Sequence, residues 1–387
     1  CPIKIPVQKR WSLIREGRID EAMDMSLSYT PFPATVCGYL CPNLCMQSCT
    51  RKSQSLPELN IQEMGKASIK ARLPELPALS GKKIAILGGG PAGISTAWQL
   101  RLKGHEAIIY EQASQLGGKI ASVIPNTRIP DKIFETEIKK IKQVIPHTYL
   151  EKKLSKADVE QLSHDFDFVV IASGTQKSRS LPVPGQEKAI SALEFLARAK
   201  SAEQEVGEHV LIIGAGNVGC DVATEAHRLG ADRITLLDIQ EPAASYKEIQ
   251  AAQAVGATFR WPVYTSEITD QGVKLTNGEL IKANTLVFAL GEAPDPDFLP
   301  ENIKLEKGFI QVDANYQTSR ENIFAIGDVV RPGLLTDAIG AGKIAAEAIC
   351  RRLENKQAIQ QEGLEIDTKR VTLEYFDPRI TDFKDLN

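Results

Sequence analysis

The chain has 387 residues, of which 43% are apolar and 25% are charged, and its formal net charge is −3. A chain of this length and composition supports two or three domains with cores of their own. The nearly balanced charge argues against a basic surface that binds nucleic acid. Because no long uninterrupted apolar run occurs, we expect no membrane-spanning helix.

Residues 1–75 form a polar segment with short helical patterns and a concentration of cysteines. Five of the seven cysteines of the chain occur here, namely Cys1, Cys37, Cys41, Cys45 and Cys49. Gly38 and Pro42 argue against one regular helix through the last four. Since thiolates are soft ligands that suit iron–sulfur clusters, we expect cluster ligation and a reducing, cytoplasmic compartment. A zinc site and inert thiols are the alternatives.

After a proline-rich linker, residues 82–111 read as strand, glycine turn, helix and strand. "KKIAILGGG" is followed by the helical "PAGISTAWQLRLKG" and the strand "HEAIIYE". Gly88, Gly90 and Gly93 fill the G-x-G-x-x-G positions, where glycine allows a tight turn, close approach to a pyrophosphate and helix–strand packing. Glu111, at the end of the second strand, can accept a hydrogen bond from a ribose hydroxyl. A plain glycine turn is the alternative.

The same order of elements begins again at residue 208. "EHVLIIGAG", "NVGCDVATEAHRLG" and "ADRITLLD" read as strand, helix and strand, with Gly214, Gly216 and Gly219 in the loop and Asp238 at the second strand end. Two copies of one βαβ plan predict an α/β protein with two Rossmann-like dinucleotide-binding domains. Such a pair most simply combines a flavin with a nicotinamide, and the cofactors then carry the redox chemistry.

A third signal follows both dinucleotide folds. "ENIFAIGD" reads as a strand that ends on Gly327 and Asp328, and Asp328 is placed to hold a polyol hydroxyl. The helix that follows could direct its N-terminus at a flavin ring. Neither dinucleotide domain contains the C-x-x-C dithiol that a disulfide reductase of the thioredoxin-reductase kind needs. We interpret Cys220 and Cys350, on predicted helices, as buried small hydrophobes.

These motifs together resemble one known family. "GGGPAG", "YEQASQLGGKI", "IASGTQKSRSLPVPG", "GAGNVGCD", "ALGEAPDPDFL" and "AIGDVV" look like the small (beta) subunit of glutamate synthase. The same module is similar to the N-terminal half of dihydropyrimidine dehydrogenase and to the flavin subunit of electron-bifurcating transhydrogenase. The resemblance runs from Cys1 to about Asn355. It implies a helical iron–sulfur domain at 1–75, an FAD domain at 80–190 and 297–355, and an inserted NAD(P) domain at 191–296.

The resemblance also implies the cofactor contacts by position. The FAD contacts implied are Gly88, Gly90, Ala92, Gly93, Glu111, Gly118, Lys119, Arg128, Gly174, Gly327, Asp328, Thr336 and Ala338. The nicotinamide-nucleotide contacts implied are Gly214, Ala215, Gly216, Asn217, Val218, Gly219, Asp238, Ala289 and Gly291. No side-chain acid or base is implied as catalytic, because hydride passes directly between the two cofactors.

Two [4Fe-4S] clusters belong to the family's N-terminal domain. One takes cysteines matched here by Cys1, Cys41 and Cys45, and a non-cysteine ligand whose position falls on Gly65. The other takes a cysteine matched by Cys49 and three more from upstream of Cys1. Cys37 is commonly present in the family without being a ligand, and here it could substitute. The chain as given therefore predicts at most one complete cluster.

We expect an oxidoreductase that takes hydride from a nicotinamide nucleotide to FAD and passes electrons through [4Fe-4S] clusters to a partner subunit or a fused ferredoxin-like domain. NADH is favoured over NADPH, because Asp238 is followed by Ile239 and Gln240 rather than by basic residues. Residues 356–387 read as an extended arm or linker. The rival functions are a stand-alone flavin reductase of a small molecule without clusters and a non-catalytic nucleotide-binding assembly subunit.

Overall fold

A computed structural model describes residues 1–54 and 56–356, so the expected C-terminal arm lies almost entirely outside the described residues. The chain divides into two compact units. The first comprises Cys1–Gly118, Arg128–Gly174 and the described residues from Pro296 onward; the second comprises Lys119–Thr127 and Thr175–Asp295. Among the described residues, no helix combines the length and the apolar character that crossing a membrane requires.

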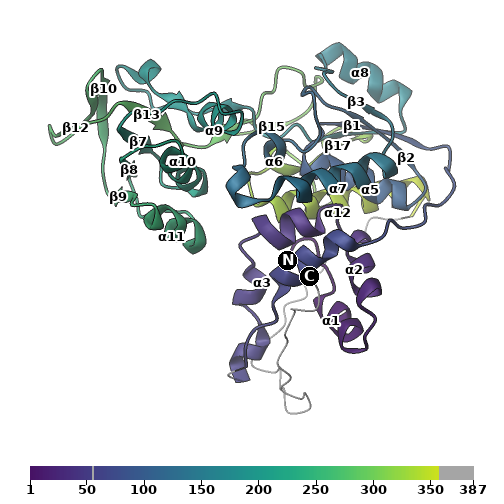
Figure 1. Cartoon of the computed structure of the whole chain (residues 1–387). Coiled ribbons are helices and arrows are strands. Elements are labelled where there is room, and N and C mark those ends of the chain that lie inside the picture. The colour runs from purple at the N-terminus through teal and green to yellow at the C-terminus, as the bar shows by residue number, and fades with distance from the viewer. Residues whose placement is uncertain (55, 357–387) are drawn as a thin grey trace. The chain divides into compact units, whose positions relative to one another are not determined.

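The N-terminal part of the first unit consists of short helices (Figure 1). Gly17 ends the first helix with a φ of +76°, a conformation that glycine adopts without strain. Leu13, Ala22 and Met23 are buried between the first two helices. The elements are α1 (Val7–Arg15), α2 (Ile19–Leu27), the π-helix η1 (Pro33–Leu40), α3 (Leu44–Gln47), the 3₁₀ helices η2 (Thr50–Gln54) and η3 (Ser68–Lys70), and between these two α4 (Ile61–Ala67).

A five-stranded parallel sheet forms the core of the first unit. Its order is β17 (Ile323–Ala325), β4 (Phe168–Ile171), β1 (Lys83–Leu87), β2 (Glu106–Tyr110) and β3 (Thr148–Tyr149). The central strand is completely buried at Ile84, Ala85 and Ile86. A near-continuous apolar run is what a parallel strand covered on both faces requires.

Helices α5 (Pro91–Leu102) and α12 (Leu335–Leu353) pack closely together in this unit (Figure 1). A Cβ atom at Gly342 would lie 2.6 Å from the carbonyl oxygen of Ala92, so glycine allows the two backbones to approach. Ser95 Oγ donates to the carbonyl of Ile339 at 2.9 Å. The remaining elements are α7 (Asp131–Val144), α8 (Lys156–Asp165), the hairpin β15 (Leu305–Glu306) with β16 (Phe309–Ile310), and the 3₁₀ helix η6 (Gly327–Val329).

The N-terminal helices dock on this α/β core within the first unit. Trp98 Nε1, on α5, donates to the carbonyl of Leu27 at 2.7 Å. The buried carboxylate of Glu137, on α7, accepts the backbone N–H groups of Ala34 and Thr35 at 2.7 and 2.9 Å. These two N–H groups belong to the first turn of the π-helix, where backbone donors have no partner in the helix itself. Polar anchors therefore fix the cysteine-bearing segment to the dinucleotide fold.

The second unit repeats the parallel-sheet plan. Its order is β6 (Ile190–Ser191), β13 (Thr285–Phe288), β7 (His209–Ile213), β8 (Arg233–Leu237) and β9 (Thr258–Arg260). Its helices are α6 (Lys119–Ser122), α9 (Ala192–Lys200), α10 (Asn217–Arg228) and α11 (Tyr246–Ala254). Smaller antiparallel pieces complete it: β10 (Thr265–Thr269), β11 (Gly272–Leu275) and β12 (Leu280–Lys282) in one sheet, and β5 (Lys177–Ser178) with β14 (Glu292–Ala293).

The sequence predicts an α/β protein with two Rossmann-like folds after a helical segment. The structure confirms this fold class, because the N-terminal helices are followed by two parallel sheets. The second sheet has a buried core of its own around Ile212, Val222 and Leu236. Cys220 and Cys350 are buried on α10 and α12, as their interpretation as small hydrophobes requires.

Candidate cofactor and cluster sites

The first glycine loop is shaped by contacts that leave no room for side chains. Gly88 follows β1 with a φ of +117°, and a Cβ there would lie 2.4 Å from the carbonyl oxygen of Ala172. A Cβ at Gly93 would lie 2.0 Å from the carbonyl oxygen of Gly88. Both distances are far below any real contact of a Cβ atom, so glycine is obligatory at both positions. Helix α5 can therefore start directly above the end of β1.

Glu111 holds this loop from the end of β2. Its buried carboxylate accepts the backbone N–H of Gly89 at 2.6 Å and that of Ala113 at 2.7 Å. A carboxylate has about four lone-pair sites, so two remain for hydroxyl donors such as those of a ribose. The acid therefore shapes the loop and keeps acceptor capacity for a nucleotide.

Three further predicted glycines leave backbone uncovered beside this loop. A Cβ at Gly118 would lie 2.9 Å from the Cα of Gly90, so the two residues meet without side chains. A Cβ at Gly90 would meet nothing closer than 3.9 Å, and one at Gly174 would meet nothing within 4 Å. Together with the start of α5, this open backbone is the kind of cradle that accepts an anionic pyrophosphate.

The Gly327–Asp328 pair lies against the same helix. Gly327 has a φ of +72°, and a Cβ there would lie 3.0 Å from the Cβ of Ala92, near the start of α5. Strand β17, which leads into the pair, is hydrogen-bonded to β4 of the same sheet. The predicted FAD contacts Ala92, Gly327 and Asp328 are thus brought together although they lie far apart in sequence.

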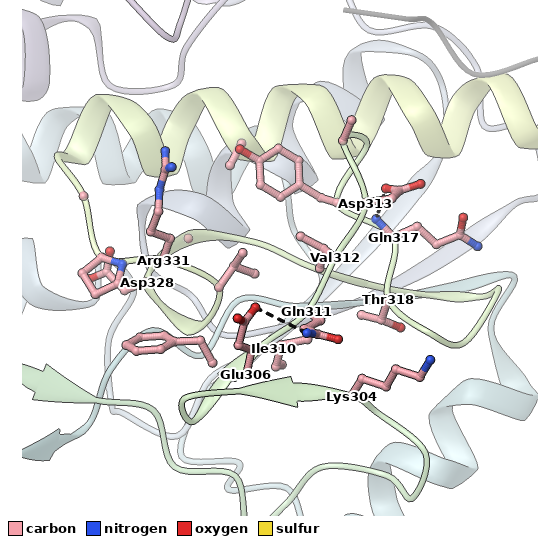
Figure 2. Close-up of a pocket in the computed structure, with 18 of the residues that line it drawn as sticks. Lys304, Glu306, Ile310, Gln311, Val312, Asp313, Gln317, Thr318, Asp328 and Arg331 are labelled. Atoms are coloured by element: carbon pink, nitrogen blue, oxygen red, sulfur yellow. Dashed lines mark hydrogen bonds between the residues drawn. The ribbon is translucent and has the colours of Figure 1, made fainter.

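A cavity of about 1020 Å³ opens beside Asp328 (Figure 2). Gly327, Asp328 and Ala338 line it, and the side chain of Thr336 is buried nearby in the first turn of α12. That turn is capped by Asp337, whose Oδ2 accepts the backbone N–H of Leu334 at 2.8 Å. The cavity is large enough for a substantial part of a flavin nucleotide.

Sequence reasoning missed the opposite wall of this cavity. Strands β15 and β16 and the turn after them supply it, with Gln311 Nε2 donating to Glu306 Oε2 at 3.4 Å. Arg331 lies on the same side as Asp328 (Figure 2). Residues 304–319 contain no recognised motif. Only their place in the sequence, between the inserted domain and the Gly327–Asp328 pair, could have suggested them.

Two predicted FAD contacts lie near the boundary between the units. Lys119, at the start of α6, belongs to the second unit, where its Nζ donates to Thr175 Oγ1 at 2.8 Å and lies 3.3 Å from Glu292 Oε2. Arg128 is the residue at which the first unit resumes. The other predicted FAD contacts lie in the first unit.

The second glycine loop repeats the first in detail. Gly214 has a φ of +113°, and a Cβ there would lie 2.3 Å from the carbonyl oxygen of Ala289. A Cβ at Gly219 would lie 2.2 Å from the carbonyl oxygen of Gly214. Asp238 Oδ2 accepts the backbone N–H of Ala215 at 2.8 Å, as Glu111 accepts that of Gly89. The two loops are therefore built by the same contacts.

The surroundings of this loop are also open toward a ligand. Cβ atoms at Gly216 and Gly291 would meet nothing within 4 Å. Asn217 begins α10, followed by Val218, and its Oδ1 accepts the backbone N–H of Ser245 at 2.7 Å. Asp238 Oδ1 accepts the backbone N–H of Gln240 at 3.1 Å. These bonds fix the chain segments next to the loop.

Four of the five N-terminal cysteines lie on, or directly after, two short helices. Cys37 is on the π-helix, Cys41 follows it, Cys45 is on α3, and Cys49 follows α3. Burial and the neighbouring Cys41 raise the pKa of the Cys45 thiol, while the amino group of Cys1 acts in the opposite direction. Burial raises the pKa of the Cys37 thiol to about 12, and Cys41 and Cys45 also act on it. Cys37, Cys41 and Cys45 thus influence one another, and the amino group of Cys1 acts on Cys45.

Gly65 cannot supply the ligand that the family places at its position. A Cβ at Gly65 would lie 2.6 Å from the backbone nitrogen of Gly38 and 2.8 Å from the carbonyl carbon of Cys37. A Glu or Gln side chain there would collide with the π-helix backbone. In the described part of the chain, no group of three or more His, Cys, Asp or Glu side chains is arranged to hold a single metal ion.

Two family models match the chain. One, described as pyridine nucleotide-disulphide oxidoreductase, matches residues 82–342. The other, described as dihydropyrimidine dehydrogenase domain II, 4Fe-4S cluster, matches residues 1–73. The two matches divide the chain where the helical segment gives way to the first parallel sheet, and they support the expected combination of a flavin and nicotinamide fold with an iron–sulfur module.

Similar proteins are themselves oxidoreductases. The oxidoreductase YgfK of Escherichia coli O157:H7 is 29% identical over 400 residues, covering 94% of this chain, but the chain spans only 38% of its length. The NAD-dependent dihydropyrimidine dehydrogenase subunit PreT of Escherichia coli K12 is 28% identical, with 82% of each chain covered. The glutamate synthase [NADPH] small chain of Azospirillum brasilense is 26% identical, with 90% and 84% covered.

Solved structures support the fold. Thioredoxin reductase of T. acidophilum superposes with a TM-score of 0.57 at 20% identity, covering 70% of this chain and 99% of the other. At this identity the likeness concerns the fold alone. The resemblance to the glutamate synthase small subunit that the motifs indicate is confirmed by the relatives, whose names include both NAD-dependent and NADPH-dependent proteins.

Proposed function

Because the chain belongs to the pyridine nucleotide-disulphide oxidoreductase family, we propose that it takes hydride from NADH to FAD and passes the electrons through a [4Fe-4S] cluster to a partner. When bound, the flavin supplies the step from two-electron to one-electron transfer. The residues of this chain bind and orient the nucleotides. The partner is a separate subunit or a fused ferredoxin-like domain, in keeping with relatives that are named as subunits.

The observation that carries this proposal is the repetition of one loop geometry. In each unit an acid at the end of the second strand accepts a backbone N–H of the glycine loop, Glu111 from Gly89 and Asp238 from Ala215. In each unit the loop opens onto a helix N-terminus, which favours an anionic pyrophosphate. Two such cradles support two dinucleotides, and the Asp328 cavity beside the first supports FAD there.

We assign the first unit to FAD and the second to the nicotinamide nucleotide. The assigned contacts are those expected from the family resemblance. The buried Glu111 and the Gly327–Asp328 pair border the first cradle. Positioning by backbone groups is the main contribution of the protein, because hydride transfer between cofactors needs no side-chain acid or base.

For the cluster we assign Cys1, Cys41, Cys45 and Cys37 as ligands. The closeness of the backbones at Gly65 and Cys37 supports this set, because the position of the usual non-cysteine ligand is filled by the π-helix itself. For Cys49, the remaining cysteine of the segment, the family resemblance implies a role as ligand of the other cluster.

NADH is the proposed nucleotide because Asp238 stands at the end of β8 with its carboxylate held by two backbone N–H groups. A carboxylate there can accept hydrogen bonds from both ribose hydroxyls and repels a 2′-phosphate. The nearby guanidinium of Arg260 is already paired with Glu279 at 2.7 and 2.8 Å. Arg260 would have to leave this ion pair before it could bind a 2′-phosphate.

The visible absorption spectrum of the purified chain, reconstituted with FAD, iron and sulfide, tests the proposal. We expect flavin bands together with a broad iron–sulfur shoulder, both bleached by anaerobic addition of NADH. Flavin bands alone would instead support a small-molecule reductase without clusters. A protein that binds neither chromophore would support an assembly subunit and would refute the proposal.

A further inference from the structure

Arg10 is a buried cation inside the cysteine-bearing segment. Only 1% of its surface is exposed. Its Nε donates to the carbonyl of Ala22 at 2.7 Å, and its Nη2 donates to Ser68 Oγ at 2.6 Å. Each of these acceptors is neutral. Among the described residues, no ion pair includes Arg10.

Burying an unpaired guanidinium is costly. Even after relaxation the penalty amounts to several kcal/mol per ion, and neutral acceptors offset it only in part. Consistent with this environment, burial lowers the pKa of Arg10 to about 10. At neutral pH the side chain therefore remains charged, and this charge has no carboxylate to balance it within the described segment.

Arg10 also approaches the backbone of α4, on the helix that packs against Cys37. Nη2 of Arg10 lies 3.4 Å from the carbonyl oxygen of Met64. The next residue, Gly65, has its backbone packed directly against Cys37 and Gly38. The α4 backbone at Met64 and Gly65 thus lies between the guanidinium and Cys37, one of the proposed ligands.

We propose that Arg10 is a positioning residue that sets the reduction potential of the cluster held by Cys1, Cys37, Cys41 and Cys45. The inference rests on the proposed cluster. A thiolate-ligated cluster carries net negative charge, and reduction adds one electron without a proton. A fixed cation at low dielectric stabilises the reduced form more than the oxidised form. Arg10 therefore makes the cluster a better acceptor of electrons from the flavin.

The test is the midpoint potential of the cluster in the full chain, measured by anaerobic dithionite titration followed by electron paramagnetic resonance. Arg10→Gln removes the charge but keeps hydrogen-bonding capacity. Ser68→Asp keeps Arg10 but places a carboxylate beside its guanidinium, which neutralises the positive charge. Ser68→Asn is the control that changes the side chain at the same position without adding a charge. Arg10→Lys retains the charge. Arg15→Gln removes an exposed cation from the same helix.

We expect Arg10→Gln and Ser68→Asp to lower the equilibrium constant for one-electron reduction of the cluster about tenfold. This corresponds to a midpoint potential that is lower by about 59 mV. Arg10→Lys, Arg15→Gln and Ser68→Asn should stay at the wild-type potential. If Arg10→Gln does not fold by circular dichroism, Ser68→Asp decides the outcome. If Arg10→Gln or Ser68→Asp folds and carries the cluster but keeps the wild-type potential, the proposed role of Arg10 is refuted, while the proposed function is not affected. A wild-type chain that assembles no cluster overturns the proposed function and this role together.

Discussion

Replacing Asp238 by Asn should weaken the discrimination against NADPH while keeping the loop intact. In the structure Asp238 Oδ2 accepts the N–H of Ala215, and the amide oxygen of Asn can take over this bond. The change therefore removes the charge, together with the bond that Oδ1 accepts from the N–H of Gln240. If Asp238 faces the ribose as proposed, a 2′-phosphate would no longer meet a carboxylate.

The expected magnitude follows from the position of the carboxylate. Two unit charges about 4 Å apart interact by roughly 4 kcal/mol at an effective dielectric near 20. Asp238 is only partly buried and Lys247 is an exposed cation at the start of α11, so solvent and this lysine should reduce the penalty by about half. About 2 kcal/mol corresponds to a roughly 30-fold change in a rate ratio.

Steady-state kinetics with an artificial electron acceptor measures this effect. The quantity compared is kcat/KM for NADPH divided by kcat/KM for NADH, and it should rise about 30-fold in Asp238→Asn. Asp270→Asn, which removes an exposed carboxylate of the same unit, should leave the ratio unchanged. Lys247→Gln should lower the ratio if this lysine reaches the phosphate.

Two results would refute the reasoning. Wild-type protein that uses NADPH as well as or better than NADH would show that Asp238 does not select the nucleotide. An unchanged ratio in Asp238→Asn would show that the carboxylate does not face the ribose at all. In the second case the nucleotide would be held elsewhere, and Asp238 would serve only to shape the loop.

Three further predictions concern the other sites. Asp328→Ala should release FAD more readily than Asp238→Ala, because a charged hydrogen bond worth roughly 1.5–3 kcal/mol is lost at the flavin in the first case only; equal loss of flavin absorbance in both would reverse the assignment of the units. Iron analysis of the reconstituted chain should give about four iron atoms per chain, and about eight would contradict the single cluster. Burial raises the pKa of Glu137 to about 7, so the folded state binds this proton more tightly than the unfolded chain. The contribution of Glu137 to stability should be fully present below about pH 4.5 and should decrease by about 3 kcal/mol as pH rises to 7; chemical denaturation should find this decrease as a pH-dependent difference between the wild type and Glu137→Gln.

Much of the candidate site could be predicted because glycine loops are local. The spacing of Gly88, Gly90 and Gly93 already implies the tight turn, and the structure shows the backbone contacts that forbid a Cβ at two of them. The wall of the Asp328 cavity could not be predicted, because β15 and β16 carry no motif and reach the site only through folding. The role of Arg10 was equally invisible, since its acceptors Ala22, Met64 and Ser68 are distant in sequence.

The sequence by itself determined the fold class, the two dinucleotide-binding folds and the cysteine-rich segment. Each depends on periodicity and spacing within some thirty residues, where the chain's own geometry sets the outcome. Only the tertiary structure decided that no side chain has room at Gly65, the position of the family's non-cysteine ligand. Close packing of α4 on the π-helix removes all space at Gly65 and leaves Arg10 charged and buried behind it. Such contacts join residues more than fifty positions apart, and no local pattern encodes them.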